Sequence, residues 1–169
     1  MRVRPYLLIA TAGAAAATTM AVLAAGGSAQ APGARTLTFR ETDRGSTFRI
    51  VDNPPRSRRT RQGFPTRASA GDTVSISQRL VQGSGPASGT IHVSCTATTG
   101  RAQRFDRAVF ACHATTTLPD GTIALEAALR FADQRVTAAV TGGTGAYEGA
   151  RGTFTSAGNP SVDTFRLLP

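Results

Sequence analysis

Lysine and tryptophan are absent from this 169-residue sequence, which has only two residues each of cysteine, histidine and tyrosine. Each absence excludes a kind of site. A P-loop requires a lysine to bind phosphate, so none can form here. Neither the G-x-S-x-G motif of serine hydrolases nor the H-E-x-x-H motif of zinc peptidases occurs. Two cysteines without a C-x-x-C pair are poor zinc ligands. We therefore predict neither a metal site nor a serine nucleophile.

Acidic residues are also scarce, since 10 of them stand against 19 basic residues, all of which are arginine. The net charge of +9 favours anionic partners such as cell-wall polymers, lipid headgroups or nucleic acid. Nucleic acid is disfavoured among these, because aromatic residues make up only 6% of the chain and no recognition helix or base-stacking platform is recognisable. We predict no nucleic-acid partner.

The first 29 residues have the pattern of a secretory signal peptide. Two arginines precede an uncharged, alanine-rich run at 6–25, and a group of small residues forms a cleavage site before Gln30. The alternative is a membrane anchor, because a run of about 20 residues could span a bilayer. Its alanine, glycine and threonine content makes it weakly hydrophobic, so we favour cleavage. This predicts a signal peptide at 1–29 and a single secreted or extracytoplasmic domain at 30–169.

Downstream, apolar and polar residues alternate in short segments. Turn residues separate these segments, and no long helical pattern lies between them. About eight strands at this spacing predict an all-β barrel or sandwich, and an eight-stranded barrel can enclose a small cavity. The expected strands are 36–41 with 46–51, 73–81, 89–98, 106–117, 122–131, 134–140, 150–156 and 162–168.

Segment 122–131 has a rival assignment. Its alanine, leucine and glutamate content favours a helix, but its apolar residues recur with a period of two and an Asp-Gly turn precedes it, so we favour a strand. In that strand Glu126 lies on a face of small alanines and points either to solvent or into a lumen. In a lumen it would be a general acid or base. The other candidates for this role are Asp133, Glu148 and Asp163.

Residues 52–70 interrupt the strand pattern. Three prolines and a basic run at Arg56, Arg58, Arg59 and Arg61 leave few apolar side chains to bury, which predicts a long exposed loop. A loop of this length is uncommon in a compact domain. It is a solvated excursion, a flap over one end of the domain, or a patch for an anionic partner.

Cys95 and Cys112 form an even pair in a chain expected to be exported, which predicts a disulfide. If the two residues face each other across a hairpin, His113 opposes Ser94, and His92 lies nearby on the face away from the disulfide. The histidines are then a metal pair, an acid–base pair or two ordinary polar residues. Two histidines without a third ligand make a poor metal site.

Five glycines lie between Gly142 and Gly152. A dinucleotide-binding fingerprint would need a third glycine where Glu148 stands, and a helix where a strand is expected to follow. Glycine permits tight and left-handed backbone geometry. We therefore predict a turn between two strands, which holds Tyr147 and Arg151.

The same stretch, G-G-T-G-A-Y-E-G-A-R-G, resembles the G-G-T-G-x-Y/F-x-x-A-R-G signature of the dirigent and allene oxide cyclase superfamily. The L-P-D-G-T-I turn at 118–123 and the strand entry at 71–73 are similar to other elements of that family. The resemblance covers roughly residues 70–168. The arginine-rich segment 52–70 is not part of the family pattern.

This resemblance implies an eight-stranded antiparallel β-barrel of the allene oxide cyclase and dirigent type, often a homotrimer, with a lumen for a small and largely apolar molecule. Members guide the coupling of phenol radicals or cyclise reactive intermediates without a metal or organic cofactor. Arg151 matches the motif's arginine, which lies near the pocket in dirigent proteins, and Tyr147 matches its aromatic position. Both are the ligand-binding residues that the resemblance suggests.

We therefore predict an exported barrel that binds a small hydrophobic molecule and acts as a cofactor-free cyclase or isomerase, or as a dirigent-like stereochemical guide. Its pocket would hold a reactive conformer, with Arg151 stabilising negative charge and Glu126 as a second catalytic candidate. The alternative is a non-catalytic envelope or binding protein that contacts anionic cell-surface material through the arginine-rich segment.

Overall fold

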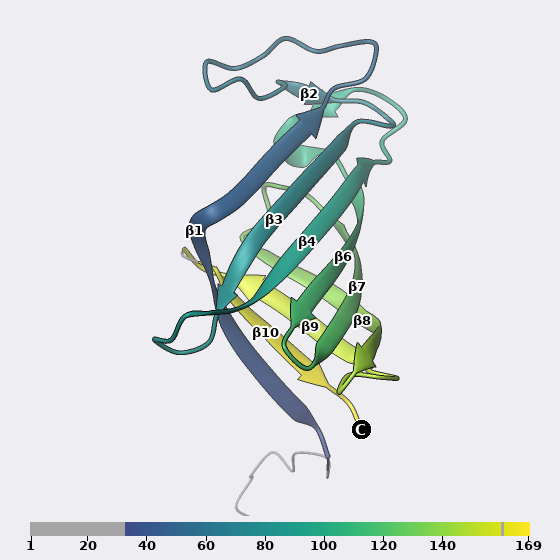
Figure 1. Cartoon of the computed structure of the whole chain (residues 1–169). Coiled ribbons are helices and arrows are strands. Elements are labelled where there is room, and N and C mark those ends of the chain that lie inside the picture. The colour runs from purple at the N-terminus through teal and green to yellow at the C-terminus, as the bar shows by residue number, and fades with distance from the viewer. Residues whose placement is uncertain (1–32, 160) are drawn as a thin grey trace, which may run out of the picture.

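The computed structural model describes residues 33–159 and 161–169, which form a closed barrel of eight antiparallel strands (Figure 1). This confirms the predicted fold class. A separate two-stranded sheet pairs β2 (Arg67–Ala68) with β5 (Gln103–Arg104), and a 3-10 turn follows at Phe105–Arg107. The barrel strands are β1 (Arg35–Val51), β3 (Thr73–Val81), β4 (Ala87–Ala97), β6 (Phe110–Leu118), β7 (Gly121–Leu129), β8 (Arg135–Gly145), β9 (Gly152–Ala157) and β10 (Val162–Leu167).

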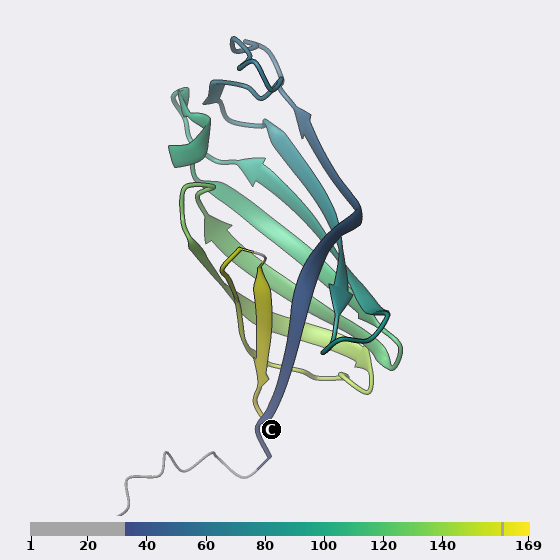
Figure 2. The ribbon, with the colours of Figure 1, turned by 90° about the vertical axis from the view of Figure 1, so that its left-hand side faces the viewer.

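The barrel has two distinct ends, because antiparallel strands that follow one another place their connections alternately above and below (Figure 2). We call the end that carries the connection 52–72 the upper end. The connections 98–109 and 130–134 also lie there. The lower end carries the connections 82–86 and 146–151, together with the C-terminus (Figure 1).

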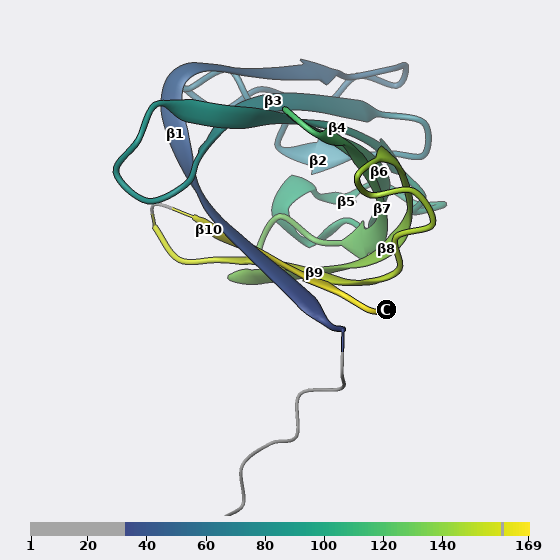
Figure 3. The same cartoon turned by 60° about the horizontal axis from the view of Figure 1, so that its bottom comes forward.

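Strand β1 is bent and pairs with two neighbouring strands. Its lower part pairs with β10 from Arg35 to Arg40, and its upper part pairs with β3 as far as Val51, with a register shift between Thr42 and Thr47. The sequence predicted strands at 36–41 and 46–51, and they are one bulged strand. Beyond Arg40, β1 parts from β10, so the barrel is less tightly closed in its upper half (Figure 3).

Segment 122–131, for which the sequence allowed a helix or a strand, forms strand β7. Ile123 and Leu125 are buried while Glu126 and Ala128 are exposed, as expected when side chains alternate between the two faces of a sheet. The glycine-rich stretch is likewise the end of β8 followed by the turn 146–151. Gly152 opens β9 with φ of 145°, and a Cβ atom there would collide with the Arg166 carbonyl oxygen. Only glycine fits that position.

Two hydrophobic clusters fill the barrel, one above the other. The lower one is large and aromatic, and the Phe165 ring in it contacts both the Phe39 and the Phe154 rings. The upper one is built around Phe110 and the two cysteines. In the described part of the chain, no helix is long and apolar enough to cross a membrane. The predicted signal peptide lies outside the described residues.

Candidate functional site

A cavity of about 220 Å³ occupies the upper half of the lumen, above the aromatic cluster. Its wall is mainly apolar, because the inward-facing positions of six strands carry aliphatic, alanine or aromatic residues. Arg130 and Asp133, which are exposed and belong to the β7–β8 connection, border it at the upper end, so the cavity opens there. Among the apolar lining residues are Ile76, Val93, Ala114, Leu125, Val136 and Phe154.

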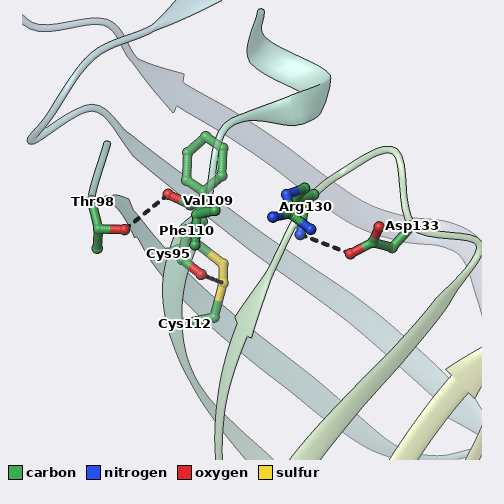
Figure 4. Close-up of a disulfide and its surroundings, with 7 residues drawn as sticks. All are labelled: Cys95, Thr98, Val109, Phe110, Cys112, Arg130 and Asp133. Carbon is green, nitrogen blue, oxygen red and sulfur yellow. Dashed lines mark hydrogen bonds between the residues drawn. A yellow bond between two sulfur atoms is a disulfide. The ribbon is translucent and has the colours of Figure 1, made fainter. Parts of the chain in front are cut away.

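The Cys95–Cys112 disulfide forms part of the cavity wall (Figure 4). The two sulfur atoms lie 2.03 Å apart, and the cysteines are directly opposed between β4 and β6. His113 opposes Ser94 in the same ladder, as predicted. Both the pairing and its register are therefore confirmed. Because the disulfide faces inward, the histidines lie on the outer face.

Two carboxyl groups stand at the edge of the apolar cavity. Glu41 borders it from β1, in the inward register of the buried residues Leu37 and Phe39. Asp163 on β10 is fully buried, and it pairs in register with Phe39 and with the cavity-lining Ser156. Neither carboxyl oxygen of Asp163 has a hydrogen-bond partner among the described residues.

Burial raises the pKa of Asp163 from 3.8 to about 7, and the nearby carboxyl group of Glu41 adds to the shift. The Ser156 hydroxyl on the neighbouring strand acts in the opposite direction and lowers the pKa of Asp163. Burial also raises the pKa of Glu41, although Gln78 and Ser161 stabilise its ionised form. Both shifts favour the protonated form of the pair relative to ordinary carboxyl groups.

No arginine neutralises this acid pair. The described residues contain two ion pairs, and neither involves Glu41 or Asp163. The adjacent Arg40 lies on the outer face of β1 and donates a hydrogen bond to the Gly83 carbonyl oxygen at 2.6 Å. An acid pair without a counter-ion, next to an apolar cavity, can hold a proton and exchange it with a bound molecule.

The turn at the mouth of the cavity is held by Asp133, whose carboxylate accepts a hydrogen bond from the Arg130 main-chain N–H at 3.1 Å (Figure 4). Phe131 lies between them and packs edge-on against Phe110, with ring centroids 4.9 Å apart. Asp133 thus shapes the rim of the cavity, and the Arg130 guanidinium supplies a positive charge there.

Glu126, which the sequence singled out as a catalytic candidate, points to solvent. Its carboxylate lies 3.5 Å from Nδ1 of His113, and both side chains are more than half exposed. Glu126 is one of the residues around the cavity, but strand parity turns its side chain to the outer face. Of the two orientations considered from the sequence, the lumen-facing one is therefore not observed.

Arg151 and Tyr147 lie at the lower end, away from the cavity. Arg151 is exposed, and its carbonyl oxygen accepts a hydrogen bond from the Leu168 N–H at 2.8 Å. Tyr147 is buried in the lower cluster beneath Arg35, whose guanidinium carbon lies 5.3 Å from the ring centroid. Neither residue borders the cavity. The structure thus separates the family's glycine-rich signature from the acid pair.

Sequence reasoning missed Glu41 altogether and named Asp163 only as one of several acids. A signal was present, because Leu37, Phe39 and Glu41 alternate along one strand, and Asp163, Phe165 and Leu167 along another. A charged residue in the apolar register of a strand is expected to face the core. The proximity of Glu41 and Asp163 could not be predicted from the sequence, because it depends on β1 lying beside β10.

The fold and its acid-edged lumen define a small barrel with an internal cavity. The model of the allene oxide cyclase barrel-like domain matches residues 57–161, and the chain belongs to that family. The match includes most of the arginine-rich segment, which the sequence had placed outside the family pattern. Among proteins of curated function, none matches the chain significantly.

Solved structures with the same fold include a pyocyanin demethylase, with a TM-score of 0.61 and 22% identity, over 79% of this chain and all of that chain. A pterocarpan synthase dirigent protein has a TM-score of 0.55 and 16% identity, over 79% of this chain and 82% of the other. A nonspecific heme-binding cyclase that catalyses a 4 + 2 cycloaddition has a TM-score of 0.50 and 17% identity, over 80% of this chain and 67% of the other. At these identities the likeness concerns the fold alone.

Proposed function

We propose that the barrel binds a small, largely apolar molecule in the upper lumen and transfers a proton to or from it, as a cofactor-free isomerase or cyclase. The observation that carries this proposal is the acid pair of Glu41 and Asp163 beside an apolar cavity without a counter-ion. The domain acts outside the cytoplasm, an inference supported by the disulfide and by the signal-like start of the sequence.

The two acids have different roles in this proposal. Glu41 borders the cavity and is the group that contacts the ligand, whereas Asp163 lies behind it. General acid–base catalysis is most effective when the pKa of the group lies near the working pH. Asp163, with a pKa of about 7, sets the charge of the pair and so controls whether Glu41 gives or takes a proton. Asp163 is thus a positioning residue.

The volume of the cavity limits the size of the ligand. Its 220 Å³ is less than the roughly 300–1,000 Å³ of sites that bind drug-sized molecules. The ligand is therefore of the order of one or two fused rings, with a polar atom directed at Glu41. Solved structures of similar fold include a cyclase and a dirigent protein, which supports cyclisation or stereochemical guidance as the reaction class. A homotrimer is the assembly we expect.

Binding of 2-naphthol tests the site, because this fluorophore has two rings and one hydroxyl group, and the protein lacks tryptophan emission. We expect Ala114→Phe, which fills the cavity, to abolish binding, and Ala128→Phe on the outer face to preserve it. Glu41→Gln should weaken binding about tenfold, through loss of a hydrogen bond to a charged acceptor. Glu148→Gln, at an exposed position, is the matched control. Unchanged affinity in Ala114→Phe would place the ligand elsewhere.

Proton transfer is tested on the natural ligand. Native mass spectrometry of the exported protein identifies a co-purified molecule and reports trimers in the same spectrum. Incubation of that molecule with the protein in D₂O should then introduce deuterium at the reacting carbon. The proposal predicts that Glu41→Gln abolishes this incorporation while Glu126→Gln leaves it intact. Equal incorporation in both variants would exclude Glu41 as the transferring group, and no incorporation by the parent protein would leave binding as the only function of the cavity.

A second candidate is a non-catalytic envelope protein that uses the arginine-rich segment to contact anionic material. The observation that favours it is the exposure of Arg56, Arg58, Arg59 and Arg61 without an acidic partner among the described residues. Vesicle binding, described below, tests this candidate independently of the cavity.

A further inference from the structure

The upper end of the barrel carries an ordered hairpin at residues 58–66, which we call the arginine hairpin (Figure 1). The N–H groups of Thr60 and Thr66 donate to the carbonyl oxygens of Phe64 and Arg58, each at 2.7 Å. Arg59 and Pro65 form a β-bridge between the two arms. The segment predicted as a loop is thus a hydrogen-bonded element, which holds its side chains in defined places.

Positive charge on this hairpin and the segment before it is not neutralised. Arg56, Arg58, Arg59 and Arg61 are exposed, and the two described ion pairs involve other residues. The nearby acids are already engaged with main-chain groups. Asp52 accepts from the Ser57 N–H, and Asp72 accepts from the N–H groups of Asn53 and Ser69. Asp52 and Asp72 are buried, while Asp106 is paired with Arg104 and Asp133 accepts from the Arg130 N–H, so unpaired exposed arginines dominate the surface of the upper end.

Exposed apolar side chains lie beside these arginines. Phe48, Val51 and Phe64 are 43%, 56% and 42% exposed, and only two other large hydrophobic residues of the described chain are comparably exposed. Phe64 packs against Phe48 at 5.6 Å, and Phe48 packs against Phe131 at 6.5 Å. Phe131 borders the cavity, so a continuous aromatic path joins the hairpin to the lumen.

We propose that the upper end docks on an anionic lipid bilayer, with the four arginines on the headgroups and Phe48 and Phe64 at the interface. This deepens the second candidate function and does not depend on the catalytic proposal. Aromatic rings are favoured at the membrane interface, and juxtaposed arginines are attracted to anionic headgroups. A hydrated polyanion would bind the arginines equally well, but it has no apolar region in which the exposed phenylalanine and valine side chains could be buried. The observations therefore favour a bilayer.

Docking in this orientation would place the mouth of the cavity against the bilayer. Phe131, Arg130 and Asp133 border that mouth at the same upper end. A small apolar molecule dissolved in the membrane could then enter the lumen without crossing water. At the lower end, Leu168 is the one large hydrophobic side chain of the described residues that is comparably exposed. The exposed acids Asp120 and Glu148 lie on turns there, among arginines such as Arg151.

Sedimentation of the purified full chain with vesicles tests the proposal. Vesicles of phosphatidylcholine with phosphatidylglycerol are compared with vesicles of phosphatidylcholine alone, which measure any background from the apolar residues 6–25. We expect binding to the anionic vesicles to exceed that background and to fall with salt. Replacing Arg56, Arg58, Arg59 and Arg61 with serine should reduce the excess about tenfold or more, given the affinity that each basic residue contributes.

The control removes the same number of charges elsewhere, with serine at Arg40, Arg79, Arg151 and Arg166, which are exposed on the barrel and its lower end. This variant should keep most of the binding to anionic vesicles above the background.

Phe64→Ser should weaken vesicle binding several-fold and leave binding to soluble polyphosphate unchanged. Equal losses in the two arginine variants would refute a specific surface. Loss in the hairpin variant with no effect of Phe64→Ser would indicate a soluble polyanion instead. Binding of 2-naphthol should persist in all these variants, so the two proposals fail separately.

Discussion

The lower and upper halves of the barrel share most of their strands but differ in how the lumen is filled. Below, three phenylalanine rings and Tyr147 meet in a buried cluster. Above, inward positions carry Ala114, Ala127 and the disulfide, and these smaller groups leave the cavity. The difference shows that one barrel can separate stability from binding along its axis, through the size of the side chains at successive inward positions.

Strand β1 reinforces this division. Where it pairs with β10 it closes the lower half, and where it leaves β10 it places Glu41 next to the cavity. The acid pair therefore lies at the boundary between the two halves. Asp163 is on the packed side, with Phe165 two residues further along β10, and Glu41 is on the open side.

The largest effect should come from the packed half. Phe165→Ala removes a fully buried ring and should cost about 3–5 kcal/mol of unfolding free energy. Phe131→Ala at the mouth, where the side chain is only partly buried, should cost much less, about 1–2 kcal/mol, because its site can fill with solvent. Urea unfolding of the two variants checks this contrast. Equal losses would mean that the upper half is packed as tightly as the lower one.

The disulfide should be the main covalent support of the open half. It closes a loop with a sequence separation of 17, for which loop entropy predicts about 3 kcal/mol. We expect the Cys95→Ala, Cys112→Ala double variant to lose about that amount. It should also bind 2-naphthol more weakly, since the cavity wall is no longer fixed. Urea unfolding and fluorescence titration measure the two effects. A stability loss with unchanged affinity would show that the disulfide does not shape the site.

The acid pair should make stability depend on pH in an unusual direction. The pKa of Asp163 is raised from 3.8 to about 7 in the folded state, so between these values the folded protein binds more protons than the unfolded chain. Stability is therefore highest below pH 4 with respect to this group, falls as the pH rises through the window, and is constant above it. The slope should approach about 1.4 kcal/mol per pH unit in the middle of the window.

Asp163→Asn tests this directly, because it keeps the shape of the side chain and removes its charge. The variant should lose most of the slope, keep a smaller one of the same sign from Glu41, and be more stable than the parent above pH 7. Thermal unfolding from pH 4.5 to 8.5 is the measurement, with Glu148→Gln as a control that should retain the full slope. A parent protein whose stability rises across this window would contradict the assignment.

Much of the fold was readable because each strand carries its own local signal. The alternation from Thr73 to Val81 marked that strand at its observed bounds, and the cysteine pair gave the register of β4 against β6. The Gly142–Gly152 signature pointed to the correct family. The departures are at strand ends and at the bulge of β1, where hydrogen bonding to two neighbours decides the bounds.

The site was readable only in part, because it depends on contacts between distant strands. The arginine and tyrosine of the signature were natural candidates, yet they lie at the opposite end of the barrel from the cavity. Glu41 and Asp163 are separated by most of the chain and meet only when β10 closes the barrel onto β1. Strand parity could have marked each acid as inward, but not that the two form a pair.

The smallest effect should come from the outer face of the same strands. The pair of Glu126 with His113 is largely exposed, and such surface pairs contribute about 0–1 kcal/mol. Glu126→Gln should therefore change the unfolding free energy by less than about 0.5 kcal/mol and leave 2-naphthol binding unaltered, in contrast to Glu41→Gln. Fluorescence titration and urea unfolding of the two variants side by side provide the comparison. If Glu126→Gln instead weakened binding as much as Glu41→Gln, the ligand would have to contact the outer face of β7, and the division between a binding lumen and an inert exterior would not hold.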